Sequence, residues 1–323
     1  MDGDELCFTQ LNASCSRTRP RSRLSAVLLA LVAVLTVVLN LLVVVSISHF
    51  RQLHTTTNLL VFSLAVTDFL LGFLQMPSVL VLYQSCWLLG NFICDVNFFM
   101  GGFLVSVSVG NMVLISVDRY VAVCEPMFYS TKVTVKRVQL CVCLCWLCSV
   151  VHSSWLLRDF FKQQHRYDFC SGACAAEFKL SEVAFDTAVT FLGPVAVIVL
   201  LYVRIFAVAV SQARAMRSHV TAFAAKRSEA VRPKKSELKA ARTLGVVIVV
   251  FILCYSPFCV IIVGIMNNST WAFDATIQYW LVYSNSCLNP LIYAFVYPWF
   301  RKSIKHIVTL QILQPNSSEA NVL

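Results

Sequence analysis

The sequence predicts an all-α membrane protein: a seven-transmembrane helix bundle with its N-terminus outside and a short cytosolic amphipathic helix after the last span. Of the 323 residues, 58% are hydrophobic and only 13% are charged, which is too apolar for an ordinary soluble domain. The apolar residues also gather into blocks of about 20 residues or more, the length that a helix needs to cross a bilayer core of about 30 Å. Runs of this length are predicted as helices, because lipid offers the backbone no hydrogen-bond partners.

Seven apolar blocks follow one another along the chain. They cover residues 24–49, 57–82, 92–121, 139–157, 180–208, 241–266 and 275–297. We expect an extracellular tail at 1–23, the membrane bundle at 24–297, and a cytosolic amphipathic helix and tail at 298–323. The first 23 residues lack a long apolar run, so we expect no cleavable signal peptide and insertion by the first helix itself.

The placement of Lys and Arg predicts which side of the bundle faces the cytosol. Ten of them lie in 204–242, between the fifth and sixth blocks, whereas the loops at 83–92 and 267–274 contain none. Arginines in the N-terminal tail run against this rule, but the later loops are one-sided, so we expect the N-terminus outside. The net charge of +10 then lies mostly on the cytosolic surface, where it suits an anionic lipid leaflet or an acidic protein partner. Nothing in the sequence indicates nucleic-acid binding.

An amphipathic helix is expected after the seventh block, from residue 297 to about residue 312. Phe300, Ile304 and Ile307 would face lipid on one side of this helix. Lys302 and Lys305 would face the headgroups on the other side, so the helix would lie along the membrane surface.

Cysteines fall into two groups. Six of the 14 lie on the expected outer side, where an oxidising environment allows disulfides: Cys7, Cys15, Cys86, Cys94, Cys170 and Cys174. Four others, at 141, 143, 145 and 148, crowd the fourth block; their spacing suggests metal ligands, but we interpret them as small apolar packing residues. Also on the outer side, Asn12 begins the sequon Asn-Ala-Ser, which predicts glycosylation.

Asp186 is an acidic residue inside the fifth apolar block, eight residues before Pro194. A carboxylate at this depth is costly unless it is paired or faces a polar cavity, so Asp186 is a candidate functional residue whose expected partner is a cation. The alternatives are a solvated Asp close to a loop and an Asp paired with Lys179. Glu182 lies one helical turn away on the same face, although a solvated loop Glu is the simpler interpretation there.

Polar and proline residues recur inside the blocks in a definite order. They are Asn40, Asp68, Asp118-Arg119-Tyr120, Trp146, Pro194, Pro257 and Asn289-Pro290, with Tyr293 shortly after. Each is weak alone, but the ordered set resembles the rhodopsin-like G-protein-coupled receptors from residue 24 to about residue 308. The resemblance implies an outer ligand cavity and an inner cleft for a heterotrimeric G protein.

The same resemblance implies an activation switch at the inner ends of the helices. Arg119 needs an anionic partner, which Asp118 or Glu237 could supply; a simple snorkelling arginine is the alternative. Breaking such a pair would open a cavity for a partner protein, with Pro257 kinking the sixth helix. The other expected members are Tyr120, Tyr202, Phe251 and Tyr293. Tyr255 stands where most relatives carry Trp.

A buried sodium pocket is a further implied feature. Its expected members are Asp68, Ser108, Asn285, Ser286 and Asn289. A carboxylate with several neutral oxygens suits a small hard cation, so an allosteric Na+ is the one cofactor we expect. Alternatively, Asp68 is a protonated packing residue held by hydrogen bonds.

A more specific resemblance lies at the end of the seventh block. The run from Asn285 to Lys302, Asn-Ser-Cys-Leu-Asn-Pro-Leu-Ile-Tyr-Ala-Phe-Val-Tyr-Pro-Trp-Phe-Arg-Lys, is similar at every defining position to the trace amine-associated receptors. The segment 237–245 is similar as well. This resemblance implies an amine ligand, a stimulatory or olfactory G protein, and two outer disulfides, Cys94–Cys174 and Cys15–Cys170. An unpaired Cys15 is the alternative to the second.

The family's usual amine anchor, an Asp on helix three, is replaced here by Gly101. Some fish members similarly lack that residue and carry an Asp on helix five, so the resemblance assigns the ammonium to Asp186 through a charge-assisted hydrogen bond. Gly101 and Gly102 would widen the pocket opposite Asp186, and Glu182 could hold the second ammonium of a diamine. The other expected contacts are Val105, Thr187, Phe191, Tyr255, Phe258, Tyr279 and Tyr283. Aromatic faces among them attract ammonium groups.

These features predict an amine-sensing olfactory receptor in the plasma membrane, in cilia or microvilli of olfactory sensory neurons. Binding at Asp186 would draw helices five and six together and shift the bundle towards the active form. Helix six would pivot at Pro257 and the Arg119–Glu237 contact would part. No catalytic constellation is recognised, so we do not expect an enzyme. The alternatives are the same fold serving a non-amine ligand and, less favoured, a transporter or channel.

Overall fold

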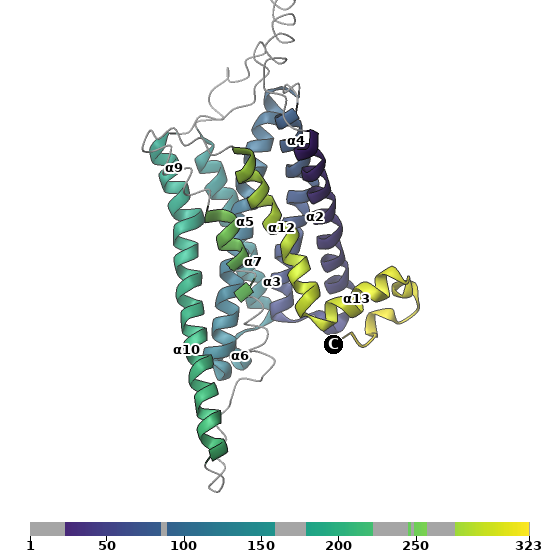
Figure 1. The fold of residues 1–323 in the computed structure, drawn as a ribbon, viewed down its shortest axis with the longest axis vertical. Coiled ribbons are helices and arrows are strands. Elements are labelled where there is room, and N and C mark those ends of the chain that lie inside the picture. Colours follow the sequence, from purple (N-terminus) through teal and green to yellow (C-terminus); the bar gives the residue numbers. More distant parts are fainter. Residues whose placement is uncertain are drawn as a thin grey trace, which may run out of the picture.

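The computed structural model describes residues 23–84, 89–158, 179–221, 245–246, 249–256 and 275–322, and the regular elements assigned in them are helices (Figure 1). In chain order they are α2 (Arg23–His49), η1 (Arg51–Leu53), α3 (Thr56–Leu70), η2 (Leu71–Gln75), α4 (Met76–Gln84), α5 (Gly90–Cys124), α6 (Pro126–Lys132), α7 (Val135–Leu156), α9 (Leu180–Thr187), η3 (Ala188–Leu192), α10 (Gly193–Thr221), α12 (Ala275–Val296), α13 (Pro298–Val308), η4 (Gln311–Leu313) and η5 (Ser317–Glu319). Residues 249–256 are also helical.

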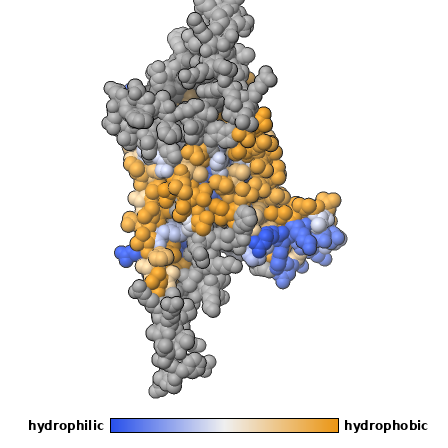
Figure 2. Space-filling view, viewed as in Figure 1, coloured by the Kyte–Doolittle hydropathy of each residue, from blue (hydrophilic) through white to orange (hydrophobic). Residues whose placement is uncertain are grey.

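Five helices in the described part of the chain are long and apolar enough to cross a membrane. They cover Ala26–His49, Thr56–Val81, Phe92–Cys124, Val135–Leu156 and Leu180–Ser211. The seventh expected span is α12, and most of the sixth lies outside the described residues. Figure 2 shows apolar side chains gathered in a band across the middle of the molecule. The predicted all-α membrane bundle is confirmed.

The long helix α5 occupies the middle of the bundle, where it packs against α3, α7 and α10. Two of the ordered motif residues tie neighbouring helices together. Trp146 Nε1 on α7 donates to Ser63 Oγ on α3 at 3.0 Å. Asn40 Nδ2 on α2 donates to the Ser286 carbonyl on α12 at 3.0 Å. Buried polar groups of this kind need partners in a low-dielectric interior, so these bonds also fix the order of the helices.

Helix starts follow ordinary capping rules. Thr55 and Thr134 precede α3 and α7, and the hydroxyl of each accepts from the backbone N–H three residues later. Pro126 and Pro298 occupy the first positions of α6 and α13, where a missing N–H costs nothing. The fifth span runs to Thr221, beyond the predicted end at 208, because no Gly or Pro follows Pro194 within it to stop the helix.

Two single π-helical turns interrupt the spans beside functional candidates. η2 joins α3 to α4, and η3 joins α9 to α10. A π turn adds one residue, which rotates the chain on one side by about 100° relative to an unbroken α-helix. Gln75 ends η2 and Asp186 lies just before η3, so helical periodicity alone does not give the directions of their side chains.

α13 leaves the bundle at the end where α6 lies (Figure 1). Phe300 is fully buried and packs with Trp299 in the main hydrophobic core, so the prediction that Phe300 faces lipid is wrong. The cause is the turn at Tyr297 and Pro298, which places the first turn of α13 against α2 and α12. Leu310 has a left-handed φ of 58°, and the helix ends at Val308 instead of continuing to about residue 312.

Candidate functional site

Asp186 lies in the last turn of α9, with its side chain 23% exposed. Its ionic partner is His152 of α7, whose Nε2 is 3.5 Å from Asp186 Oδ1. The basic side chain beside this carboxylate is thus a histidine of α7 rather than Lys179. Sequence reasoning did not identify His152. The signal that could have found it is a lone ionisable residue inside an apolar span.

The imidazole of His152 is enclosed by protein. Its side chain is 14% exposed, and both ring nitrogens are buried without a hydrogen-bond partner among the described residues. Phe185 lies beside it, with ring centroids 6.5 Å apart. Because 3.5 Å exceeds a good charge-assisted hydrogen bond of about 2.7–2.9 Å, the contact with Asp186 is a loose one.

Glu182 is bound to the protein at both carboxylate oxygens. Arg158 Nη2 donates to Oε1 at 3.2 Å, and the Lys179 backbone N–H donates to Oε2 at 3.2 Å. Glu182 is buried in the first turn of α9, so the interpretation as a solvated loop residue is wrong. Its charge is already neutralised, which also removes the free carboxylate that a second ammonium of a diamine would need. The Arg158 guanidinium also stacks on Trp155, 4.4 Å from the ring centroid.

The space beside Gly101 is filled by a side chain of η2, in the second span. A Cβ added at Gly101 would lie 2.9 Å from Nε2 of Gln75. That buried amide donates to Asn97 Oδ1 at 3.1 Å. A Cβ at Gly102 would instead meet Ser153 Oγ of α7 at 3.7 Å. The prediction that these glycines widen the pocket is therefore wrong, because Gln75 fills the space beside Gly101, and Gly102 faces α7.

The other expected ligand contacts divide between two apolar clusters. Phe191 and Tyr255 are buried in the main core, and Tyr283 is buried in a smaller cluster around Leu104. Val105 is partly buried and packs against both clusters. Thr187 is buried, and its hydroxyl donates to its own helix at the Val183 carbonyl, 2.8 Å away. Phe258 and the side chain of Tyr279 lie outside the described residues.

The expected sodium ligands are all buried in the bundle. Asp68 is fully buried and accepts from Asn289 Nδ2 at 2.8 Å. Each of these five residues has a buried oxygen with no hydrogen-bond partner among the described residues: Asp68 Oδ1, Ser108 Oγ, Asn285 Oδ1, Ser286 Oγ and Asn289 Oδ1. Orphaned buried oxygens of this kind call for a bound cation or water. A negative carboxylate with neutral oxygens fits a small hard cation.

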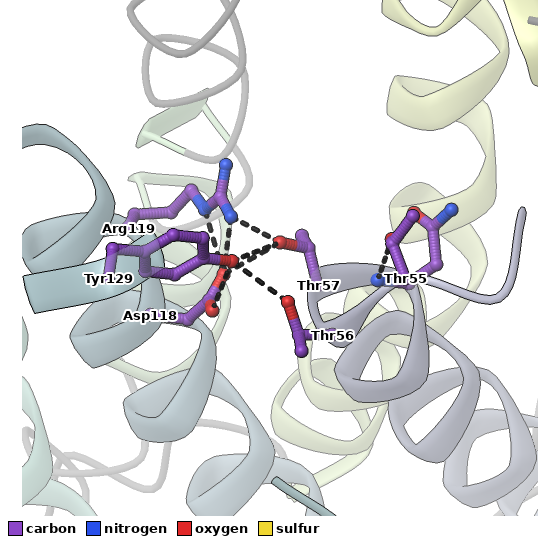
Figure 3. Close-up of polar contacts among 7 residues, drawn as sticks. Thr55, Thr56, Thr57, Asp118, Arg119 and Tyr129 are labelled. Atoms are coloured by element: carbon purple, nitrogen blue, oxygen red, sulfur yellow. Dashed lines mark hydrogen bonds and ion pairs between the residues drawn. The ribbon is translucent and has the colours of Figure 1, made fainter. Parts of the chain in front are cut away.

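At the inner end, Arg119 pairs with the neighbouring Asp118, and both are buried. Figure 3 shows the polar cluster around this pair. Thr57 of α3 donates to Asp118 Oδ2 at 2.9 Å, and Tyr129 of α6 donates to Asp118 Oδ1 at 3.0 Å. Arg119 also donates to Thr57. The snorkelling alternative for Arg119 is therefore wrong, because its guanidinium points into the protein.

Thr57 and Tyr129 were not predicted as members of this cluster. The Tyr129 hydroxyl also hydrogen-bonds with Thr56 Oγ1 at 2.9 Å, so it bridges α6 and α3. Burial, and then the Asp118 carboxylate, raise the pKa of Tyr129, so its phenol stays a proton donor. No local pattern announces these contacts, which join residues far apart in sequence.

The remaining switch residues are partly described. The hydroxyl oxygens of Tyr202 and Tyr293 are buried and have no hydrogen-bond partner among the described residues. Phe251 is fully buried and lies against Tyr255, with ring centroids 4.5 Å apart. Tyr120 is partly buried beside Val123 and Ile205. Glu237 and Pro257 lie outside the described residues.

Cysteines of the described part behave as two classes. Cys94 is disulfide-bonded, and its partner lies outside the described residues, as do Cys15, Cys170, Cys174 and the sequon at Asn12. The four cysteines of α7, at 141, 143, 145 and 148, are free thiols. Within the described ranges, no cluster of three or more His, Cys, Asp or Glu side chains could hold a metal ion.

Comparison with known proteins places these features in context. The family model of the seven-transmembrane receptors of the rhodopsin family matches residues 39–293. The chain is 38% identical over 336 residues to trace amine-associated receptor 13c of Danio rerio, with 99% of this chain and 97% of the relative covered. It is 40% identical to trace amine-associated receptor 9 of Mus musculus, covering 98% and 94%. It is also 40% identical to trace amine-associated receptor 7c of Rattus norvegicus, covering 98% and 92%.

Proposed function

Because the chain belongs to the trace amine-associated receptors of the rhodopsin family, we propose that it senses cationic amines through Asp186 and activates a stimulatory or olfactory G protein. Family membership makes it a multi-pass receptor of the plasma membrane and a signalling protein, not an enzyme or a transporter. The olfactory role and a place in sensory cilia or microvilli belong to the proposal.

The observation that carries the proposal is the state of Asp186. Its carboxylate lies within a membrane span, is partly exposed, and among the described residues has only a loose ionic contact, with His152. A carboxylate in a low-dielectric site gains a strong interaction from an ammonium that can approach to hydrogen-bonding distance. Glu182 cannot take this role, because Arg158 and the backbone already hold it.

The wall around an amine would be largely apolar. Phe191, Tyr255 and Tyr283 supply buried aromatic surface in the same bundle, and Phe258 and Tyr279 are assigned to the pocket by family resemblance. An ammonium gains from aromatic faces as well as from a carboxylate. Small organic cations with an apolar body therefore suit this cavity better than strongly hydrated ones.

Transmission to the G protein would use the cluster at the inner end. Ligand binding shifts the bundle only if the amine binds the active form more tightly than the resting form. In the structure, Asp118 holds Arg119 and is itself held by Thr57 and Tyr129. Parting these contacts, and the proposed one between Arg119 and Glu237, would free the inner cleft.

Two further assignments accompany the receptor proposal. Asp68 of α3, Ser108 of α5, and Asn285, Ser286 and Asn289 of α12 would hold an allosteric Na+, which would supply a positive charge for the buried carboxylate. On the outer side, Cys94–Cys174 and Cys15–Cys170 would pin the second outer loop, and Asn12 would be glycosylated.

The test is a second-messenger assay over a panel of amines in cells that express the parent receptor or Asp186→Asn. The parent should respond and Asp186→Asn should lose potency by at least about a hundredfold, since removing one partner of a buried charge pair costs about 3–5 kcal/mol. Asp95→Asn, which changes a partly buried acid of α5, is the matched control and should respond as the parent does. Surface expression of all three must be equal. An Asp186→Asn receptor with parental amine responses would remove Asp186 as the anchor.

A non-amine ligand is the second candidate, favoured by the neutral Gln75–Asn97 amide pair at the place of the usual anchor. Uncharged analogues of each amine, with a hydroxyl replacing the amino group, separate the two. A response to the neutral analogues that survives Asp186→Asn would support this alternative.

A further inference from the structure

The imidazole beside Asp186 is an unused hydrogen-bonding group. Both nitrogens of His152 are buried, and neither has a hydrogen-bond partner among the described residues. Buried polar groups are normally bonded, and an exception calls for a specific explanation. Asp186 Oδ1 lies 3.5 Å from Nε2, too far for a good hydrogen bond.

We infer that His152 is a second contact for the ligand ammonium and makes the site selective for amines with at least two N–H bonds. The inference rests on the proposed binding of amines at Asp186. The ammonium would donate one hydrogen to Asp186 Oδ1 and another to the unprotonated Nε2 of His152. A primary amine, with three N–H bonds as its ammonium ion, satisfies both acceptors, whereas a quaternary ammonium has no N–H bond to offer.

The spacing of the two acceptors agrees with this arrangement. Two acceptors at about 2.8 Å from one nitrogen, along tetrahedral N–H directions, are about 4.6 Å apart. The observed separation is 3.5 Å. A rotation of the Asp186 carboxylate supplies the missing ångström, and the 23% exposure of that side chain leaves it room to move. The contact seen without ligand is thus a slightly collapsed form of the pair that would receive the ammonium.

The other charged groups near His152 are engaged with one another, which leaves His152 and Asp186 to the ligand. Arg158, two residues beyond the end of α7, is bound to Glu182 and stacked on Trp155. Glu182, the acid one turn from Asp186 on α9, is likewise engaged by Arg158 and the Lys179 backbone. Histidine is the basic side chain that readily exists without charge at neutral pH. An arginine here would pair with Asp186 permanently and exclude the ligand.

The experiment is a methylation series on one amine skeleton, from the primary amine to the quaternary ammonium. It is measured on the parent, His152→Ala, His152→Asn and Asp186→Asn at equal surface expression. In the parent, the half-maximal concentration should be at least about tenfold lower for the primary than for the quaternary compound, the worth of one hydrogen bond to a charged group. His152→Ala should raise this value for the primary amine and leave the quaternary compound unchanged, so that the ratio falls towards one. His152→Asn, which keeps an acceptor, should retain part of the preference.

The outcomes separate this inference from the proposed function. If the parent responds equally to the whole series, or His152→Ala shifts every compound by the same factor, the inference is wrong while amine sensing at Asp186 stands. If Asp186→Asn responds as the parent does, the anchor itself is wrong and the inference falls with it. Should His152→Ala fail to reach the cell surface, the ratio measured on His152→Asn decides, because a purely structural histidine would not change selectivity between compounds.

Discussion

Alanine at Gly101 should destabilise the receptor relative to alanine at Gly102, although the two positions are adjacent on α5. A Cβ at 101 would lie 2.9 Å from Nε2 and 3.3 Å from Cδ of Gln75, which is closer than side chains tolerate without moving. A Cβ at 102 would meet Ser153 Oγ at 3.7 Å, an ordinary contact. The pair therefore isolates the effect of the Gln75 amide.

The magnitude follows from two terms. Both substitutions should gain about 0.5–1 kcal/mol, because alanine is a better helix former than glycine. Only at 101 must the amide end of the Gln75 side chain shift. If that shift breaks its 3.1 Å hydrogen bond to Asn97, a buried amide oxygen is left unsatisfied. Full loss of the bond costs about 1–3 kcal/mol, so Gly101→Ala should be less stable than Gly102→Ala by up to about that amount.

Thermal unfolding of the purified receptor in detergent measures the difference. At about 2–4 °C per kcal/mol for a chain of this order of size, Gly101→Ala should have a Tm several degrees below that of Gly102→Ala. In a Gln75→Ala background the collision is gone, and adding Gly101→Ala should then raise Tm. Equal Tm values for the two single variants would refute the reasoning, because they would mean that Gln75 does not fill the space beside Gly101.

Three further substitutions probe other parts of the structure. Tyr129→Phe removes a hydrogen bond to the charged Asp118, worth about 1.5–3 kcal/mol, and should raise basal second-messenger output; unchanged output would separate Tyr129 from the switch. For the sodium pocket, the parent should be less sensitive to amines in NaCl than in KCl, and Asp68→Asn should abolish that difference; a difference that persists in the variant would contradict the assignment. Tyr255→Phe deletes a buried hydroxyl that has no described partner, so Tm should stay level or rise, and a clear fall would show that the hydroxyl is bonded.

The fold was predictable because the features that determine it, the length and apolar composition of the spans, can be read directly from the sequence. Span length and apolar composition follow directly from bilayer thickness, and the ordered motif residues turn out to tie helices together, as Asn40 and Trp146 do. Helix ends were less predictable where the apolar signal stops before the helix does. The fifth helix continues to Thr221 on helix propensity alone, after its lipid-facing stretch has ended.

The candidate site was predictable in its residue types but not in its pairings. Asp186 could be singled out as a carboxylate in a membrane span, yet its partner His152 belongs to another helix and no spacing rule links the two. The wall beside Gly101 was misjudged for a related reason. A glycine on α5 suggests open space, but Gln75, at the end of the π turn η2, fills that space. Tertiary contacts of this kind depend on helix rotation, which a single inserted residue changes by about 100°.

Two acid–base pairs link α9 to the end of the fourth span, one from His152 of α7 and one from Arg158 just beyond α7. The difference between them explains why one acid can serve a ligand and the other cannot. Glu182 faces Arg158, whose guanidinium keeps its charge at any accessible pH and is further fixed by Trp155. That pair is permanent and serves to anchor the start of α9. Asp186 faces His152, which can lose its charge and which lies at a distance too long for a firm bond. The first pair holds the helices in place, so that the second can exchange its internal partner for an external ammonium without α9 shifting.

The substitution His152→Arg should give Asp186 the same kind of partner that Glu182 has. The arginine would then pair with Asp186 and keep the ammonium from it, so amine responses should be lost at normal surface expression. Retained amine responses in that variant would show that the ligand does not compete with residue 152 for Asp186.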